Sequence, residues 1–446
     1  MFLLLNGRLL TRDPAQPWVE DGAVAVQGDT IAAVGDRAAL EARYPDAERV
    51  DAHEGLIMPG LINAHTHIYS GLARGLSIPG NDPKTFLEVL EGTWWNIDRH
   101  LTLDLTRASA QVTALECIRN GVTTLFDHHA SYAQVRGSLF AIRDELADMG
   151  LRACLCYEVS DRDGPQKCEE AILENAEFAR WAAGQSDGRF CALFGGHALF
   201  TLSDRTLERM AQANAGLTGF HLHVAEGMDD VYDSLRRYAR RPVERLLDAG
   251  LLGPKTMLGH CIHLSPSEWD ILARTGTMVV NNPQSNMNNA VGCAPVLEMM
   301  RRGILVGLGT DAYTHDMLES LKAVPLIQRH HAALPNVGFA EAFQMLFINN
   351  AAIAARCFAK PLGVLRPGAA ADIAVMDYRP FTPLGPDNAD GHILFGLSGR
   401  CCRTVVANGR LVYRDRAFVD IDEQAVSARA QALSRKLWSR LARPHS

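Results

Sequence analysis

Histidines and carboxylates near the ends of predicted strands are the residues whose types and spacing suggest catalysis. His221 and His223 lie in a β-like run, residues 218–224, and Glu226 follows three positions after His223. Side chains alternate faces along a strand, so both imidazoles point the same way. A metal-binding imidazole beside a carboxylate that can carry protons is half of a hydrolytic site. We predict His223 as a metal ligand and His221, one pleat deeper, as a structural residue.

Further candidates follow other predicted strands. His65 and His67 have the HxH spacing that suits chelation of one ion, although ordinary polar residues at a barrel mouth explain this motif equally well. Asp311 follows an apolar strand flanked by glycine, and it is either a ligand that also acts as a base or the N-cap of a helix. His260 ends another strand, where it is placed to polarise a bound water or the substrate.

The candidates together indicate a site for one metal ion. Three histidines and one aspartate at the ends of predicted strands 1, 5 and 8 are a donor set that suits Zn²⁺, with Fe²⁺ or Mn²⁺ as alternatives. Predicted strands 3 and 4 contain no lysine that, once modified, would bridge two ions. We therefore predict one divalent cation, with Zn²⁺ as the first choice.

Four further residues are candidates for substrate contact, each with a structural alternative. His128 ends strand 2 and equally suits hydrogen bonding behind the site, and His197 ends strand 4 and equally suits satisfying a loop. Trp94, in the loop after strand 1, either stacks on a planar ring or packs in the core. Asn286 belongs to an amide-rich loop that either binds a polar heterocycle or holds the loop after strand 8.

The elements that must position these residues predict an α/β protein with a (β/α)8 barrel of the TIM type. Eight apolar strands alternate with helical patterns in the middle of the chain, which is the count of a closed parallel barrel. These strands are residues 61–64, 122–126, 152–157, 190–194, 219–224, 256–259, 277–280 and 304–309. Short strands at both termini predict a small β-sandwich built from residues 1–58 and 363–446, with the barrel at 59–362. Within the C-terminal part we expect a loop at 381–392 and a surface helix at 423–441.

Composition narrows the class of protein. The 446-residue chain is 47% apolar with a net charge of −7, as in a globular enzyme, so we expect neither nucleic acid nor anionic lipid as a partner. No uninterrupted apolar window reaches the length of a membrane span. Ten scattered cysteines in a chain of this length predict reduced thiols and a cytoplasmic location.

Several segments, in this order, resemble the amidohydrolase superfamily, and most closely its mononuclear branch of deaminases and triazine hydrolases. The matching segments are PGLINAHTH at 59–67, HVAE at 223–226, HCIH at 260–263, GTD at 309–311 and GVLRPGAAADI at 363–373. The run NPQSNMNNAVG at 282–292 is similar to the SsnA-type aminohydrolases within that branch. The resemblance implies His65, His67, His223 and Asp311 as metal ligands, Glu226 and His260 as catalytic partners, and a homodimer or larger homo-oligomer.

The function we expect is deamination of a purine-, pyrimidine- or triazine-like ring, with release of ammonia after attack by a metal-bound hydroxide. In this hypothesis Asp311 takes the proton of the water, His260 orients it, and Glu226 protonates the ring nitrogen beside the attacked carbon. Hydrolysis of a cyclic amide or of a C–Cl bond by the same chemistry is the alternative. A non-catalytic metal-binding scaffold is a third interpretation.

Overall fold

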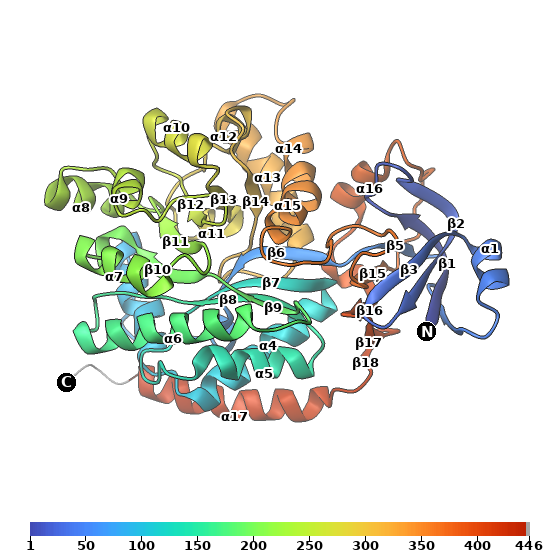
Figure 1. Ribbon diagram of the computed structural model, residues 1–446, viewed down its shortest axis with the longest axis horizontal. Coiled ribbons are helices and arrows are strands. Elements are labelled where there is room, and N and C mark those ends of the chain that lie inside the picture. Colours follow the sequence, from blue (N-terminus) through green and yellow to red (C-terminus); the bar gives the residue numbers. More distant parts are fainter. Residues whose placement is uncertain (443–446) are drawn as a thin grey trace.

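A barrel of parallel strands forms the body of the protein, and the computed structural model describes residues 1–442 (Figure 1). Its strands are β6 (Leu61–Thr66), β7 (Val122–His129), β8 (Arg152–Tyr157), β9 (Phe190–Ala192), β10 (Phe194–Ala198), β11 (Phe220–Val224), β12 (Met257–His260), β13 (Met278–Asn281) and β14 (Val306–Leu308). They pair in two parallel sheets, β6-β7-β8-β9 and β10-β11-β12-β13-β14. Parallel bridges between Thr66 and Asp311 and between Val159 and Gly196 join the two sheets at both edges. This arrangement is consistent with the expected (β/α)8 barrel.

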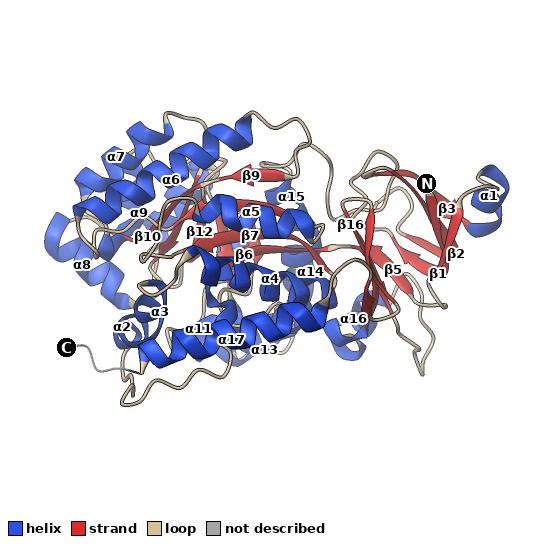
Figure 2. Ribbon diagram, turned by 90° about the horizontal axis from the view of Figure 1, so that it is seen from below, coloured by secondary structure: helices blue, strands red, loops and turns tan. Residues whose placement is uncertain are grey.

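Helices surround these strands, as Figure 2 shows. The longer ones are α4 (Leu103–Arg119), α5 (Ser138–Asp148), α6 (Pro165–Ala183), α7 (Asp204–Asn214), α8 (Met228–Tyr238), α10 (Pro266–Thr275) and α13 (Met317–Ala332). The shorter ones are α2 (Phe86–Val89), α3 (Trp95–Asp98), α9 (Pro242–Asp248), α11 (Pro283–Asn288), α12 (Val296–Arg301), α14 (Phe339–Phe343) and α15 (Asn350–Ala354). None of the helices in residues 1–442 is both long enough and apolar enough to span a lipid bilayer.

Buried Asn350 fastens the first strand of the barrel to the last. Its side-chain amide donates to the carbonyl oxygens of Ile62 and Leu308, each at 2.8 Å, and its Oδ1 accepts from the backbone N–H of Leu308 at 2.8 Å. β6 and β14 lie far apart in sequence, so one side chain satisfies backbone groups that no adjacent strand reaches. The asparagine therefore stabilises the position at which the ring of strands closes.

The fourth strand of the barrel extends further than predicted. The predicted strand ended at residue 194, whereas β10 continues through Gly195 and Gly196 to Ala198. A Cβ atom on Gly195 would lie 2.3 Å from the carbonyl oxygen of Tyr157. The glycines therefore permit a close approach of strands rather than a turn.

Strands from both termini form a single nine-stranded sheet beside the barrel, at the right of Figure 1. They are β1 (Phe2–Leu10), β2 (Trp18–Gln27), β3 (Thr30–Asp36), β4 (Glu48–Asp51), β5 (Leu56–Pro59), β15 (Ile373–Met376), β16 (Cys402–Ala407), β17 (Arg410–Arg414) and β18 (Ala417–Phe418). β5 pairs with β15 in antiparallel register, which joins the two ends of the chain directly before and after the barrel. Helix α1 (Arg37–Arg43) follows β3 at the outer edge of this sheet.

Two helices of the C-terminal part test the predictions made there. The prediction of a loop over residues 381–392 is wrong for its last four residues, because helix α16 (Ala389–Gly396) begins at Ala389. This helix buries Ala389, Ile393 and Leu394. This spacing puts the three apolar residues on one helical face, which the proline- and glycine-rich composition before them obscured. The expected terminal helix is present as α17 (Glu423–Leu441), and Ala430, Leu437 and Leu441 face the body of the protein.

Candidate metal and catalytic site

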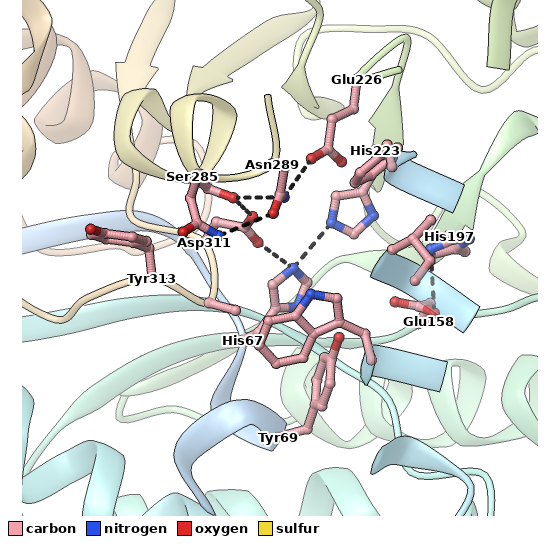
Figure 3. A pocket seen from close by; sticks show the side chains of 15 residues that line it. His67, Tyr69, Glu158, His197, His223, Glu226, Ser285, Asn289, Asp311 and Tyr313 are labelled. Atoms are coloured by element: carbon pink, nitrogen blue, oxygen red, sulfur yellow. Dashed lines mark hydrogen bonds and ion pairs between the residues drawn. The ribbon is translucent and has the colours of Figure 1, made fainter. Parts of the chain in front are cut away.

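The four predicted ligands converge at the C-terminal ends of β6, β11 and β14, and Figure 3 shows three of them, His67, His223 and Asp311. His67 Nε2 lies 2.7 Å from Asp311 Oδ1 and 3.2 Å from His223 Nε2. His65 Nε2 lies 3.5 Å from the same carboxylate oxygen. Donor atoms of His65, His223, His260 and Asp311 all fall within 4.8 Å of one another. His67 is connected to this group through its contacts with Asp311 and His223.

The backbone turns sharply where three of these strands end. Ala225, His260 and Asp311 follow or end β11, β12 and β14, and they have φ angles of 49°, 67° and 55°. Residues other than glycine rarely adopt this left-handed conformation, and it occurs preferentially at functional sites. For Asp311 the turn is fixed by its N–H, which donates to the carbonyl oxygen of His65 at 3.0 Å. The turns hold these residues at the mouth of the barrel.

Hydrogen bonds behind the imidazoles orient the donor nitrogens. His67 Nδ1 donates to the backbone oxygen of His128 at 2.6 Å, which leaves the Nε2 lone pair free for a cation. His65 Nδ1 lies 2.8 Å from Nε2 of His221, so His221 supports a ligand rather than acting as one. This position agrees with the structural role expected for His221.

The residues present fit a divalent cation. The buried atoms His65 Nε2, His223 Nδ1 and His260 Nε2 have no hydrogen-bond partner within residues 1–442. Burial lowers the pKa of His65 to about 3 despite the neighbouring Asp311, so its imidazole is neutral and able to coordinate. Burial also raises the pKa of Asp311, but the cationic His67 outweighs it and the pKa lies well below its usual range. Burial lowers the pKa of His67, but the ionised Asp311 outweighs it and raises that pKa to about 9, so a cation bound at His67 Nε2 would replace a proton there. With that proton displaced, neutral imidazoles facing an ionised carboxylate are the donor set that Zn²⁺ prefers.

Glu226 and His260 face one another beside this region. Glu226 Oε2 lies 3.4 Å from His260 Nε2, and Asn289 Nδ2 donates to Glu226 Oε1 at 3.3 Å. Burial raises the pKa of Glu226, although His260 opposes the rise. His260 Nδ1 lies 2.7 Å from Asn286 Oδ1, and because an amide oxygen only accepts, the His260 proton is on Nδ1. Glu226 is therefore a carboxyl group suited to holding a proton, beside an imidazole whose Nε2 accepts one.

A cavity of about 140 Å³ opens above these residues. Its walls contain the apolar and aromatic side chains Tyr69, Phe86, Leu90, Trp94 and Tyr313. Its floor and polar wall contain His67, Glu158, His197, His223, Glu226, Ser285, Asn288, Asn289 and Asp311. The cavity is suited to a small planar ring with polar edges.

Two of the four expected substrate contacts line this cavity and two lie behind it. Trp94 and His197 are on its wall. His128 is fully buried, and its Nε2 donates to the backbone oxygens of Gly196 and His221 at 3.0 and 3.2 Å. Asn286 is also buried, where it holds His260. The expectation that His128 and Asn286 touch the substrate does not fit these positions, because both side chains are engaged in the protein interior.

The polar cavity residues Glu158, Ser285, Asn288 and Asn289 were not among the predicted site residues. Glu158 follows β8, and its carboxylate lies 3.9 Å from His197 Nε2. Burial alone would raise the pKa of Glu158, but His197 and Arg162 outweigh it and hold the pKa well below its usual range. Ser285 donates to Asp311 Oδ2. The position of Glu158 directly after a predicted strand was the available signal, whereas Ser285 had none apart from its amide-rich loop.

Comparison with known proteins gives consistent matches over nearly the whole chain. The model of the amidohydrolase family matches residues 56–412, and that of an imidazolonepropionase-like composite domain of bacteria matches residues 22–47. A 5'-deoxyadenosine deaminase of Methanosarcina barkeri is 29% identical, with 98% of this chain and 99% of that protein covered. A 5-methylthioadenosine/S-adenosylhomocysteine deaminase of Haloarcula marismortui is 32% identical, with 98% of each covered.

Solved structures show the same architecture. An adenosine deaminase from Xanthomonas campestris with bound zinc superposes with a TM-score of 0.86 over 98% of both chains at 22% identity. An atrazine chlorohydrolase from Arthrobacter aurescens complexed with zinc has a TM-score of 0.81 at 25% identity, covering 97% of this chain and 100% of that one. The family model covers most of the chain, and the Haloarcula marismortui deaminase is 32% identical over 98% of it. The chain therefore belongs to the amidohydrolase family.

Proposed function

We propose that this protein is a metal-dependent aminohydrolase that deaminates the adenine ring of a nucleoside or a related N-heterocycle. The observation that carries the proposal is the pairing of Glu226 with His260 at 3.4 Å, beside the donor set and on the wall of a cavity sized for a ring. The curated relatives are named as deaminases of 5'-deoxyadenosine and of methylthioadenosine or S-adenosylhomocysteine, which supports an adenine-bearing substrate.

We propose His65, His67, His223 and Asp311 as the ligands of one divalent ion, with Zn²⁺ favoured by the donor set and by the zinc in both structural relatives. When bound, such an ion lowers the pKa of a coordinated water from about 15.7 towards about 7. Fe²⁺ and Mn²⁺ are the alternatives for the same donors.

The protein side chains supply the proton transfers. Glu226, whose pKa is raised by burial, protonates the ring nitrogen next to the amino-bearing carbon. Asp311 accepts a proton from the attacking water, and Ser285 holds the other carboxylate oxygen. His260 accepts a hydrogen bond from that water through Nε2. As the C–N bond breaks, the proton held by Asp311 passes to the leaving nitrogen and ammonia departs. The proton of the added hydroxyl passes to the Glu226 carboxylate, which restores that carboxyl group and leaves a ring carbonyl.

The cavity wall offers hydrogen-bonding groups for the remaining edge of the ring. His197 Nδ1 donates to Thr201 Oγ1 at 3.0 Å, which leaves Nε2 as an acceptor. Glu158 is an ionised acceptor beside it. We propose that His197 and Glu158 receive hydrogen bonds from the substrate, and that Trp94 packs against its ring.

Ammonia release from a panel of N-heterocycles tests the proposal. The panel contains 5'-deoxyadenosine, methylthioadenosine, S-adenosylhomocysteine, adenosine, guanine and cytosine, each incubated with zinc-loaded protein. Ammonia formation in step with the spectral change of adenine to hypoxanthine is the expected result. Zinc-loaded protein that releases no ammonia from any of these rings would contradict the deaminase assignment.

Hydrolysis of a C–Cl bond is the second candidate, and the likeness to an atrazine chlorohydrolase at 25% identity favours it. The same water and the same Glu226 would serve, because protonation of a triazine nitrogen activates the chlorine-bearing carbon. Chloride release from a chlorotriazine, measured beside the ammonia assay, distinguishes the two.

We further propose how this chain is organised. We propose that the terminal segments 1–58 and 363–446, which share the nine-stranded sheet, form the small β-sandwich domain beside the barrel at 59–362. The antiparallel pairing of β5 with β15, which joins the segments directly before and after the barrel, supports this division. We also propose a cytoplasmic location, which fractionation of cells tests. We propose a homodimer or larger homo-oligomer, which sedimentation of the purified protein tests.

A further inference from the structure

A second cavity, of about 580 Å³, adjoins the catalytic one. It lies between α4, the loop 312–315 and the C-terminal helix α17, which Figure 1 shows running along the outside of the barrel. Trp94, Ala312 and Tyr313 contribute to the walls of both cavities. The α17 residues on its wall include Gln431, Arg435 and Trp438, and the spacing of three and four residues puts them on one helical face.

Unsatisfied polar atoms line this second cavity. His315 is 9% exposed and Thr113 is fully buried, and both contribute to the cavity wall. Within residues 1–442, His315 Nδ1 and Thr113 Oγ1 have no hydrogen-bond partner. A buried polar atom without a partner costs about 1–3 kcal/mol, so such atoms indicate a ligand or ordered water. Burial lowers the pKa of His315 to about 4, which leaves a neutral ring with one N–H to donate.

The charges around the second cavity favour an anion. Three guanidinium groups line it, and two of them are paired: Arg74 and Arg119 share Glu116. Arg119 also contacts Glu423. Arg435, at the rim, has no carboxylate partner in the described part of the chain. Donors and an excess of positive charge therefore face one space.

We propose that the second cavity binds a small anion of the phosphate or carboxylate class, and that binding acts on the loop carrying Asp311. The anion would accept hydrogen bonds from the guanidinium group of Arg435 and from the ring N–H of His315. The loop 312–315 begins directly after Asp311, and Asp316 caps α13 at its other end through the N–H groups of Leu318 and Glu319. An anion held by His315 therefore restrains a short segment fixed at both ends, one of which is the catalytic carboxylate.

Calorimetric titration with inorganic phosphate, in a buffer free of other multivalent anions, tests the proposal on the zinc-loaded protein. Wild-type protein is expected to bind one phosphate per chain. Arg435→Ala is expected to raise Kd about 5- to 10-fold, because a partly exposed charged hydrogen bond is lost. His315→Phe is expected to weaken binding by a similar factor. Arg429→Ala removes the same charge from an exposed position of α17 outside the cavity, and it should bind phosphate as the wild type does.

Two kinetic measurements separate the sources of such an anion. If the anion is a separate molecule, phosphate changes kcat or KM for neutral 5'-deoxyadenosine in wild type and Arg429→Ala but not in Arg435→Ala. If it is the anionic tail of the substrate, Arg435→Ala raises KM for S-adenosylhomocysteine and leaves 5'-deoxyadenosine unchanged. The absence of phosphate binding, or binding that Arg435→Ala and His315→Phe leave unchanged, would overturn the proposal. The titration does not depend on turnover, so it remains informative if the deaminase assignment fails.

Discussion

Replacement of Glu226 by glutamine isolates the proton that this side chain is proposed to deliver. Glutamine has the same shape and keeps a side-chain oxygen that accepts from Asn289, whose Nδ2 lies 3.3 Å from Glu226 Oε1. Its amide cannot give a proton to a ring nitrogen. The residue lies outside the proposed ligand set, so Glu226→Gln should fold and bind metal as the wild type does.

The expected loss follows from general acid catalysis by one positioned carboxyl group. Such a group contributes about 10²- to 10⁴-fold, which is about 2.7 to 5.4 kcal/mol of barrier. Burial raises the pKa of Glu226, which favours the protonated carboxyl form that can donate to the ring nitrogen. The loss should therefore appear in kcat, with a much smaller change in KM.

The assay is ammonia release from 5'-deoxyadenosine, or from whichever ring of the panel proves to be the best substrate, with metal content measured on the same samples. Asn288→Ala, also on the cavity wall and hydrogen-bonded to Asn289 rather than to Glu226, is the matched control for a change in cavity shape. A Glu226→Gln variant with full metal content and the wild-type turnover rate would refute the assigned role.

Four further variants test the ligand set, the packing beneath it and the electrostatics. His65→Ala should leave much less than one metal per chain by elemental analysis, and full occupancy would remove His65 from the ligand set. Gly309→Ala should lower both metal content and stability, by about 1–3 kcal/mol, because the new Cβ would lie 2.4 Å from Asn282 Oδ1 and 2.9 Å from His65 Cβ. Asn350→Leu should destabilise the protein by about 3 kcal/mol or more in urea unfolding, since three buried backbone groups lose their partner. The pKa of the His315 ring is about 4 in the folded protein and about 6.5 in the unfolded chain, so between these pH values the unfolded chain binds more protons and the free energy of unfolding decreases as the pH is lowered. His315→Phe removes this group, so that decrease should be smaller by about 3 kcal/mol. A pH dependence of stability equal to that of the wild type would contradict the prediction.

The residues at strand ends could be predicted because their signal is local. An HxH pair on a strand, as at His65 and His67, fixes the relative direction of two side chains without knowledge of the rest of the fold. A run of βα units then places all strand ends on one face, so His223 and Asp311 follow from the same argument. The convergence of these side chains on one region of the structure is what this reasoning anticipated.

The supporting residues could not be assigned in the same way, because their roles depend on contacts between distant strands. Asn286 was expected at the substrate, but a 2.7 Å contact across 26 residues makes it the partner of His260. His128 was open to both interpretations, and its imidazole points at carbonyl oxygens of the strands that follow. Residue type alone does not distinguish an amide that touches a ligand from one that holds a histidine.

The closure of the barrel shows most directly how the site depends on long-range contacts. Asp311 lies beside His67 because the backbone N–H groups of Thr310 and Asp311 both donate to the backbone oxygen of His65, each at 3.0 Å. Asn350 joins the same two strands a few residues earlier, at Ile62 and Leu308. These hydrogen bonds join residues that are about half of the chain apart, and the local hydrophobic periodicity of the sequence does not indicate them. Because the same contacts complete the ring of strands and gather the ligands, loosening the closure should release metal before the barrel unfolds. Asn350→Leu therefore tests more than stability: metal loss at a urea concentration below the unfolding transition is the expected result, and simultaneous loss of metal and fold would show that closure and site form one cooperative unit.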